Sequence, residues 1–423
     1  MNIVDLQNEL DRCAKCGQCR SVCPVFLALK DETLVARGRL AIIQAVQQTN
    51  SPTGKLKEIL DTCLMCRRCE ENCPSQVNTS DVFKEMRRLM SRQKGLPPLL
   101  CFAFRWVLPN RWLYDILMHL SSWVSPILRQ GTAPVRHLPL YFTNLFGRLP
   151  RLAHRSALQI HNSSFRALPP VGIINNSPKV SIFIGCAANY IYPEIIQALV
   201  SILDQLKVPY VIPQAQVCCG MPALLSGDEQ SAQRLMKINR EVFKTDTIIT
   251  VCPTCNRMLK EEYFGDRQTS RPADHQKVME AVEFLASCSS VLPSLRYSVP
   301  TAYHQPCHSA GTRAPEIIRE FLKATTDYKE IEDICCGGGG LFTFKYPELS
   351  DLIGKARVAS VERGAENAHA NTFHASRSTL NVVTNCPGCM MQMEYLLSTN
   401  NIAGIKVKHA LNLYGESLRN MKV

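Results

Sequence analysis

Cysteine constrains this chain more than any other residue, because twenty of its 423 residues are cysteines and most of them fall in repeated patterns. A segment of the form C-x2-C-x2-C-x3-C-P occurs at residues 13–24 and again at residues 63–74. This spacing is typical of bacterial ferredoxins, in which three thiolates bind one [4Fe–4S] cluster and the fourth binds the neighbouring cluster. Zinc is the alternative, but zinc favours paired C-x2-C knuckles over runs of four cysteines.

In this motif the fourth cysteine of each run binds the cluster of the other run, which predicts two ligand sets of three cysteines from one run and one from the other. One [4Fe–4S] cluster would be bound by Cys13, Cys16, Cys19 and Cys73. The other would be bound by Cys63, Cys66, Cys69 and Cys23. Apolar residues at helical spacing predict helices over residues 34–48 and 80–92. We therefore expect a small helical domain that holds two [4Fe–4S] clusters.

A longer repeat occupies the C-terminal half, and each copy has one cysteine, then Cys-Cys-Gly, then C-x2-C. The first copy contains Cys186, Cys218, Cys219, Cys252 and Cys255. The second copy contains Cys307, Cys335, Cys336, Cys386 and Cys389. Adjacent cysteines in a short loop can reach two irons of one cluster, and the glycines beside them let the backbone approach closely. The alternatives are a structural zinc site and a set of buried apolar cysteines.

Strand-like and helix-like segments alternate around the cysteines of this longer repeat. The strand-like runs are residues 180–184, 247–251 and 380–384, and the helix-like runs are residues 194–206, 231–244 and 390–397. Such alternation predicts a parallel α/β sheet in each copy, with the cysteines at the carboxyl ends of strands, where open sheets bind ligands.

These patterns predict an α+β multidomain chain with four parts. They are a helical ferredoxin-type domain (1–95), a basic and aromatic connecting segment with helices lying on the surface (96–178), and two α/β cysteine-rich domains (179–298 and 299–423).

The connecting segment also holds most of the positive charge. The formal net charge is +12, and between residues 87 and 155 eleven Lys and Arg stand against one acid, Asp115. All three tryptophans, Trp106, Trp112 and Trp123, are in the same region. No nucleic-acid motif accompanies the charge, so we expect no nucleic-acid partner.

The tryptophans and basic residues of this segment also predict a membrane contact. Tryptophan prefers the lipid headgroup level and basic residues attract anionic lipids, which predicts an interfacial helix on an anionic membrane surface. Packing of this helix on a partner subunit or on the cysteine-rich domains is the alternative.

The cellular location follows from two further features. Residues 1–12 are polar and lack a secretory signal, which indicates a reducing compartment where disulfides are rare. The most apolar stretch, residues 96–128, is interrupted by polar residues such as Arg105 and Asn110, so it does not predict a membrane-spanning helix. We expect a cytoplasmic protein that is peripheral on the inner face of the cytoplasmic membrane.

The two cysteine runs resemble the two-cluster ferredoxin domain fused to many dehydrogenase subunits, and the long repeat resembles the cysteine-rich CCG domain. From end to end the chain resembles the iron–sulfur subunit of glycolate oxidase. It is also similar to the third subunit of anaerobic glycerol-3-phosphate dehydrogenase, to lactate-utilisation proteins and to the catalytic subunit of heterodisulfide reductase. Local matches are the segments Gly185–Tyr190, Ala36–Arg39 and Tyr303–His308.

The resemblance implies cofactors. In heterodisulfide reductase a complete CCG pattern holds a non-cubane [4Fe–4S] cluster with five thiolates. Both copies here are complete, so the resemblance implies up to two further [4Fe–4S] clusters, one on each set of five cysteines.

The resemblance also implies a function, namely electron transfer from an FAD-containing dehydrogenase subunit for a 2-hydroxy acid, such as glycolate or lactate, toward a quinone. No catalytic residue is predicted on this chain, because the substrate site would lie on the partner. A catalytic subunit like that of heterodisulfide reductase is the alternative function. A membrane-docking adaptor with structural clusters is a third possibility.

Overall fold

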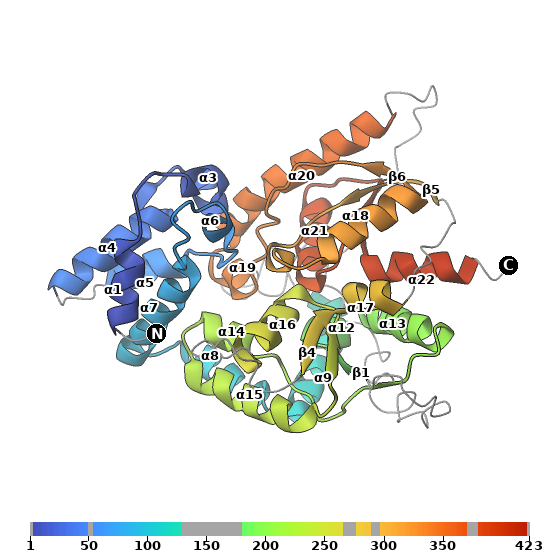
Figure 1. Cartoon of the computed structure of the whole chain (residues 1–423), viewed down its shortest axis with the longest axis horizontal. Helices are drawn as coiled ribbons and strands as arrows, with labels where there is room; N and C mark the ends of the chain where they lie inside the picture. Colours follow the sequence, from blue (N-terminus) through green and yellow to red (C-terminus); the bar gives the residue numbers. More distant parts are fainter. Residues whose placement is uncertain are drawn as a thin grey trace. The chain divides into compact units, whose positions relative to one another are not determined.

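The computed structural model describes residues 3–49, 54–128, 180–264, 276–288, 297–369 and 380–420 (Figure 1). The chain forms two compact units, and each is assembled from three separate stretches. Unit 1 consists of Met1–Arg105, Gly220–Gln233 and Ile334–Arg357. Unit 2 consists of Trp106–Cys219, Arg234–Asp333 and Val358–Val423. The domain boundaries expected after residues 95, 178 and 298 stay predictions.

Unit 1 is helical in its described residues. Its elements are α1 (Ile3–Asp11), α2 (Cys19–Val22), α3 (Pro24–Leu29), η1 (Glu32–Leu34), α4 (Ala36–Thr49), α5 (Gly54–Asp61), α6 (Arg68–Glu71), α7 (Thr79–Lys94), α8 (Pro98–Phe102), α14 (Met221–Leu225) and α19 (Leu341–Lys345). The two helices expected over residues 34–48 and 80–92 are confirmed as α4 and α7. Apolar side chains of the longer helices, among them Leu6, Ile43 and Phe83, form the core, and motif cysteines pack against it.

A buried arginine joins three stretches of backbone in unit 1. Arg87 lies on α7 and is 7% exposed. Its guanidinium donates to the carbonyl oxygens of Leu60 at 2.6 Å, Cys63 at 2.7 Å and Leu225 at 2.8 Å. A charged donor buried among carbonyls satisfies several acceptors at once, so Arg87 fixes the start of the second cysteine run against α7 and α14.

Within its described residues, unit 2 contains two parallel sheets of four strands each, and both have the same strand order. The first sheet has β1 (Val180–Phe183), β2 (Tyr210–Val211), β3 (Thr247–Thr250) and β4 (Lys277–Glu280), in the order β2-β1-β3-β4. The second has β5 (Tyr297–Tyr303), β6 (Thr326–Lys329), β7 (Leu380–Thr384) and β8 (Ile405–His409), in the order β6-β5-β7-β8. Every residue of β1 and β7 is buried, as expected for central strands of a parallel sheet. The expected α/β fold of both cysteine-rich copies is confirmed.

The register of the central strands aligns the ends that precede cysteines. Val180 pairs with Thr247 and Phe183 with Thr250, so β1 and β3 end at the same edge of the first sheet. In the second sheet, Tyr303 at the end of β5 pairs with Val383 near the end of β7. Cysteines that follow these strands therefore start from one edge of each sheet.

Helices connect and cover the strands. In the first copy they are α12 (Cys186–Tyr190), α13 (Pro193–Gln205), α15 (Glu229–Val242), α16 (Pro253–Met258), η3 (Leu259–Tyr263) and α17 (Ala281–Cys288). In the second copy they are η4 (Cys307–Ser309), α18 (Ala314–Thr325), α20 (Pro347–His369), α21 (Pro387–Thr399) and α22 (Ala410–Asn420). Helix α13 packs against α22, as Figure 1 also shows. One apolar core contains Leu199 and Leu203 of the first copy together with Met390 and Leu411 of the second, so the two copies share a core.

The expected connecting segment begins with α8 and continues through η2 (Ala103–Val107) and α9 (Arg111–Leu128). Its residues 129–178, with five of the arginines counted above, lie outside the described residues. Within the described part of the chain, no helix is long and apolar enough to cross a membrane.

Replacing Arg87 by Met is expected to destabilise the protein, because several carbonyl oxygens in unit 1 lose a buried charged donor. The expected loss is about 3 kcal/mol, measured as a lower urea midpoint in anaerobic unfolding followed by circular dichroism. The matched control is Arg92→Met on the same helix, since the Arg92 side chain is 64% exposed. Equal midpoints for the two variants would contradict this role of Arg87.

Candidate functional site

Three motif cysteines lie at turns that a following proline fixes. Cys23, Cys252 and Cys386 have extended backbone and directly precede helices α3, α16 and α21, each of which begins with proline. A residue before proline avoids the helical region, and proline is favoured as the first helical residue. In each Cys-Pro pair the cysteine is therefore the last extended residue, and the proline is the first residue of the helix. The thiol lies at the turn between the two. In C-x2-C the second cysteine then lies three residues on, on the same helix face.

The two ferredoxin-type runs bend in the same way. Lys15 and Met65, at equivalent positions, both have a φ of 56°. Gly17 and Arg67, also equivalent, have φ values of 87° and 62°. Left-handed backbone costs a non-glycine residue about 1 kcal/mol or more, and such strain is concentrated at functional sites. The shared bend therefore indicates a common geometry that both cysteine runs must adopt.

The thiols of the first run surround a pocket in unit 1. Cysteines that line it are Cys13, Cys16, Cys19, Cys69 and Cys73. This group contains the whole first predicted ligand set, and four thiols around one cavity fit a [4Fe–4S] cluster. In the second predicted set, the Cys63 sulfur lies near enough to Cys23 and to Cys69 for its charge to help raise the pKa of both. Their role as ligands stays a prediction.

Burial makes three of the ferredoxin-type thiols poor acids in the absence of a metal. Burial raises the pKa of Cys19, of Cys23 and, most strongly, of Cys69. A bound metal compensates the thiolate charge that burial disfavours. The donor set thus fits a metal cluster better than a set of free reactive thiols.

The Arg37-Gly38-Arg39 segment on α4 braces both cysteine runs. Arg37 donates to the carbonyl oxygen of Lys15 at 3.2 Å, inside the first run. Arg39 donates to the carbonyl oxygen of Ile59 at 3.0 Å, just before the second run. Gly38 has no room for a side chain, because a Cβ there would lie 1.8 Å from the carbonyl oxygen of Glu32. The sequence motif was apparent, but its bracing role was not.

The structure brings the five thiols of the first CCG copy together in unit 2. Cys186 hydrogen-bonds to Cys218, which raises the pKa of Cys186. Cys255 hydrogen-bonds to Cys219 and to Cys252. Gly185 is needed here, because a Cβ would lie 3.1 Å from the Cys255 sulfur and its φ is 74°. Their assignment as ligands of one cluster stays a prediction.

The five cysteines of the second copy are divided between the units. Cys307, Cys386 and Cys389 belong to unit 2, and Cys335 and Cys336 belong to unit 1. Within unit 1 the backbone N–H of Gly337 donates to the Cys335 sulfur at 3.4 Å. The assignment of all five to one cluster stays a prediction.

Cysteine motifs of the two copies meet in unit 2, which sequence reasoning missed. Cys252 accepts hydrogen bonds from Cys255 and from Cys386, and these hold the pKa of Cys252 well below its usual range. Next to them, Thr254 and Nδ1 of His308 are hydrogen-bonded at 2.8 Å. The first copy's C-x2-C motif therefore contacts residues of both the Cys307 and the Cys386 loops.

A buried carboxyl group holds the same two loops. Glu280, at the end of β4 in the first copy, is 2% exposed. It accepts hydrogen bonds from Ser309 at 3.1 Å, Thr312 at 3.0 Å and Asn385 at 2.5 Å, all in the second copy. Burial raises the pKa of Glu280 to about 7. Its place outside the cysteine motifs explains why the sequence did not reveal it.

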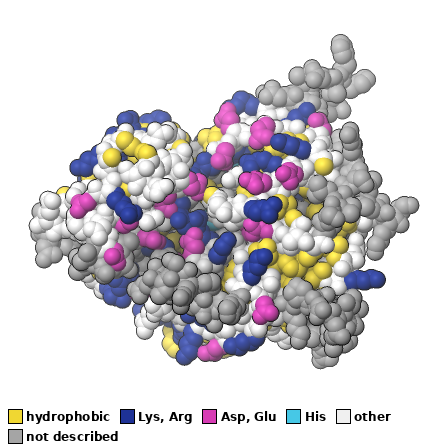
Figure 2. Space-filling view, viewed as in Figure 1, with side chains coloured by type: hydrophobic (Ala, Val, Ile, Leu, Met, Phe, Trp, Pro, Cys, Tyr) yellow, Lys and Arg dark blue, Asp and Glu magenta, His cyan; other side chains and the backbone are white. Residues whose placement is uncertain are grey.

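Positive and negative side chains lie close together on the drawn face of the protein. On the face drawn in Figure 2, Lys and Arg side chains of the described residues are interspersed with Asp and Glu. Ion pairs such as Arg88 with Glu229 and Lys345 with Asp61, both inside unit 1, show the same mixing.

Comparisons with known proteins agree with the motifs. The family model described as a 4Fe-4S dicluster domain matches residues 9–77. The CCG model, described as a cysteine-rich domain, matches residues 180–260 and 301–394.

Among individual relatives, the chain is 26% identical to the probable glycolate oxidase iron–sulfur subunit of Bacillus subtilis, over 97% of this chain and 94% of the relative. It is 24% identical to a fumarate reductase (CoM/CoB) subunit of Methanothermobacter marburgensis, over 96% of this chain and 72% of the relative. It is 32% identical to lactate utilization protein A of Oceanobacillus iheyensis, over 43% of this chain and 80% of the relative.

Metal content tests the predicted ligand sets. Four cluster sites are expected to give about 16 irons and a similar amount of acid-labile sulfide per chain, assayed after anaerobic purification. A value near eight irons would mean that the CCG copies hold no cluster. Stoichiometric zinc in place of iron would contradict the cluster prediction altogether.

Proposed function

Since the chain belongs to the family of CCG-domain iron–sulfur proteins that includes the glycolate oxidase iron–sulfur subunits, we propose that it is the electron-transfer subunit of a flavin-dependent 2-hydroxy-acid dehydrogenase. A partner subunit with FAD would oxidise a small hydroxy acid of the glycolate or lactate type. This chain would pass the electrons on toward a quinone.

The residues of this chain would hold and tune the electron carriers. Bound [4Fe–4S] clusters would supply one-electron redox chemistry. The proposed ligands are the eight cysteines of the ferredoxin-type runs and the ten of the CCG copies. Arg37 and Arg39 would keep the first two sites in shape, and Glu280 would fix the loops around Cys307 and Cys386.

The main support for this proposal is the contact between Cys252 of the first CCG copy and Cys386 of the second. Electron transfer requires neighbouring carriers. Thiols that belong to two predicted sites and touch each other would keep those sites close together. The shared apolar core of the two copies would hold the Cys252 and Cys386 loops of unit 2 in fixed positions.

The proposed acceptor requires access to a membrane, and α9 supports such access. Trp112 is 65% exposed, Ile116 47% and Leu120 58%, and their spacing puts them on one face of the helix. Trp106, just before α9, is 60% exposed. An apolar stripe with tryptophan at its start describes a helix that lies in the headgroup region. We propose that it contacts the anionic inner face of the cytoplasmic membrane. The Trp123 side chain lies outside the described part of α9.

The second candidate function is catalytic. Both CCG copies have every cysteine of the pattern, which favours a catalytic role like that of heterodisulfide reductase, with non-cubane clusters that reduce a mixed disulfide. The similarity to the fumarate reductase (CoM/CoB) relative also supports this alternative.

Replacing Cys219 by Ser is expected to separate the two functions. In a conduit, electron flow to a quinone analogue falls to background, while the partner flavin is still reduced by its hydroxy acid because that step comes first. Stopped-flow absorbance of the flavin and of the quinone measures both steps. Cys288→Ser is the matched control, since Cys288 is exposed and lies outside the motifs. The conduit proposal is wrong if the isolated protein reduces a mixed disulfide with an artificial donor and loses this activity in Cys336→Ser.

Membrane binding is expected to depend on the exposed face of α9. In liposome flotation, the protein should bind anionic vesicles, and added salt should weaken binding because basic residues contribute through screened attraction. Trp112→Ala with Ile116→Ala should lower the binding constant at least about tenfold, as the loss of two apolar contacts predicts. Leu352→Ala, at another exposed apolar residue, is the control. Binding that ignores lipid charge, salt and these substitutions would assign α9 to protein contacts.

A further inference from the structure

A buried histidine whose ring has no hydrogen-bond partner lies directly after strand β5 in unit 2. This residue, His304, is 1% exposed. Neither of its ring nitrogens has a hydrogen-bond partner within the described part of the chain. A neutral imidazole has one donor and one acceptor, and nearly all buried polar atoms in folded proteins are paired. His304 therefore requires a partner that the described residues do not supply.

Another buried histidine of unit 2 has the partners that His304 lacks. His409 is also 1% exposed. Its Nε2 lies 3.2 Å from the carbonyl oxygen of Val251, and its Nδ1 accepts from the backbone N–H of Leu411 at 3.3 Å. Burial alone therefore does not deprive a histidine of partners in this unit, and the unpaired ring of His304 belongs to its particular position.

The backbone around His304 is fixed against the second sheet. The N–H of His304 donates to the carbonyl oxygen of Val383 on β7 at 2.8 Å. The hydroxyl of Tyr303 donates to Oδ1 of Asn385 at 2.9 Å, and Nδ2 of Asn385 donates to Glu280. These contacts hold His304 beside the segment that leads from β7 into helix α21.

The ring of His304 lies next to a motif thiol on that helix. Cys389 is buried, and its Sγ and a ring nitrogen of His304 lie within 4.8 Å of each other. The two atoms are not hydrogen-bonded, since neither ring nitrogen has a partner. In zinc sites, a nitrogen bound at about 2.0 Å and a sulfur bound at about 2.3 Å lie about 3.5 Å apart when the metal is tetrahedral. The position of the ring therefore allows His304 and Cys389 to bind one metal.

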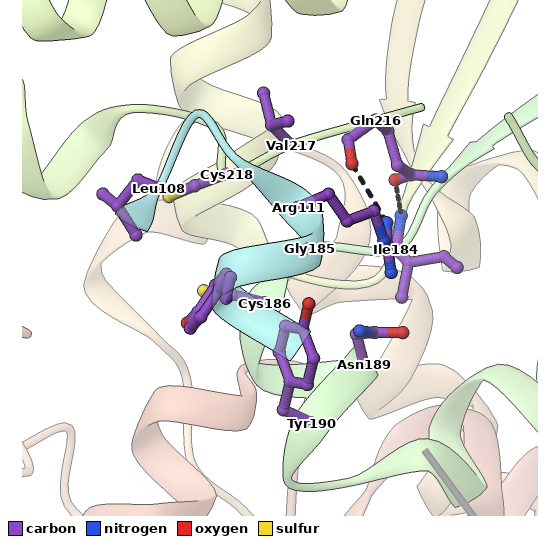
Figure 3. A pocket seen from close by; sticks show the side chains of 11 residues that line it. Leu108, Arg111, Ile184, Gly185, Cys186, Asn189, Tyr190, Gln216, Val217 and Cys218 are labelled. Atoms are coloured by element: carbon purple, nitrogen blue, oxygen red, sulfur yellow. Dashed lines mark hydrogen bonds between the residues drawn. The ribbon is translucent and has the colours of Figure 1, made fainter. Parts of the chain in front are cut away.

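The first CCG copy has an apolar residue at the corresponding place. Strand β1 ends at Phe183 and is followed by Ile184, just as β5 ends at Tyr303 and is followed by His304. Ile184 is 2% exposed and belongs to the shared apolar core. Its backbone N–H donates to the side chain of Gln216 at 2.9 Å (Figure 3). The two copies thus share their strand order and cysteine pattern but differ in this one donor.

We propose that His304 is a ligand of the iron–sulfur cluster of the second CCG copy and binds the same iron as Cys389, an inference that rests on the cluster sites of the proposed function. Imidazole nitrogen binds iron in Rieske centres, where histidine in place of cysteine raises the reduction potential. A neutral imidazole brings less negative charge to iron than a thiolate does. The first CCG site would therefore have thiolate ligands alone, whereas the second would combine thiolates with an imidazole.

Nitrogen hyperfine coupling tests the inference directly. The anaerobically purified full chain is reduced stepwise, and the electron paramagnetic resonance signal that Cys389→Ser abolishes is assigned to the second CCG site. Hyperfine spectroscopy of that signal is expected to show a nitrogen strongly coupled to iron, and isotope-labelled histidine should change the splitting. His304→Ile, which gives the second copy the residue of the first, should remove the coupling. His409→Gln, at the buried histidine with paired nitrogens, should retain it.

The reduction potential gives a second readout. His304→Cys exchanges the neutral imidazole for an anionic thiolate. It is expected to lower the potential of the same signal by at least about 59 mV, which is a tenfold change in the reduction equilibrium of a one-electron carrier. The signals of the ferredoxin-type runs should keep their potentials. If His304→Ile loses about four irons, full iron content in His304→Cys shows that a ligand was missing rather than packing.

Other outcomes overturn the inference and identify which premise fails. A coupling as strong in His304→Ile as in the wild type, a signal without nitrogen coupling, or no signal from the second site contradicts the ligation of iron by His304. Stoichiometric zinc that His304→Ile removes would mean that the histidine binds zinc instead. The conduit function stands in these cases if the protein with its flavoprotein partner still reduces ferricyanide. If no electrons reach ferricyanide although the coupling is present, the proposed function fails and the ligand assignment stands.

Discussion

A buried thiolate is stable only where a metal or hydrogen-bond donors compensate its charge, and all motif thiols of this chain except Cys16 are at buried or half-buried positions. The rest of the structure serves to bring those thiols together. Proline after Cys23, Cys252 and Cys386 fixes the turn at which each thiol lies. Parallel strands that end at one sheet edge deliver the cysteines of the CCG copies to the same side.

The two CCG copies stabilise each other inside unit 2, through a shared apolar core and through buried hydrogen bonds. The strand order is the same in both sheets, yet the copies do not behave as separate domains, because Leu199 and Leu411 belong to one core. Glu280 of the first copy fixes Ser309 and Asn385 of the second, next to Cys307 and Cys386. The loops that carry Cys307 and Cys386 are therefore held beside the first copy by packing and buried hydrogen bonds within unit 2.

Local sequence predicted the elements whose signals are local. The runs at residues 180–184, 247–251 and 380–384 became β1, β3 and β7 within a residue, because buried strands of parallel sheets are continuous apolar runs. Strands β2 (Tyr210–Val211) and β6 (Thr326–Lys329) are short and only partly buried, so they carry no such signal. Features that depend on distant contacts could not be predicted from local sequence. The left-handed backbone of Met65 and Arg67 follows from the loop geometry that they share with Lys15 and Gly17, not from their residue types. The contact of Cys252 with Cys386 joins residues 134 positions apart, and the hydrogen bond of Arg87 to Leu225 joins residues 138 apart. The unpaired ring nitrogens of His304 become apparent only when the surroundings of the side chain are known.

The central claim is that thiols in both units hold redox-active iron–sulfur clusters. A reductive titration of the anaerobically purified chain, followed by electron paramagnetic resonance at low temperature, tests it most directly. The account predicts signals from more than two distinct reduced clusters, with those of the ferredoxin-type runs retained and the others lost when Cys219 and Cys336 are both replaced by Ser. A chain that shows only the signals of two ferredoxin-type clusters before and after these replacements, or no signal at any potential, would contradict it.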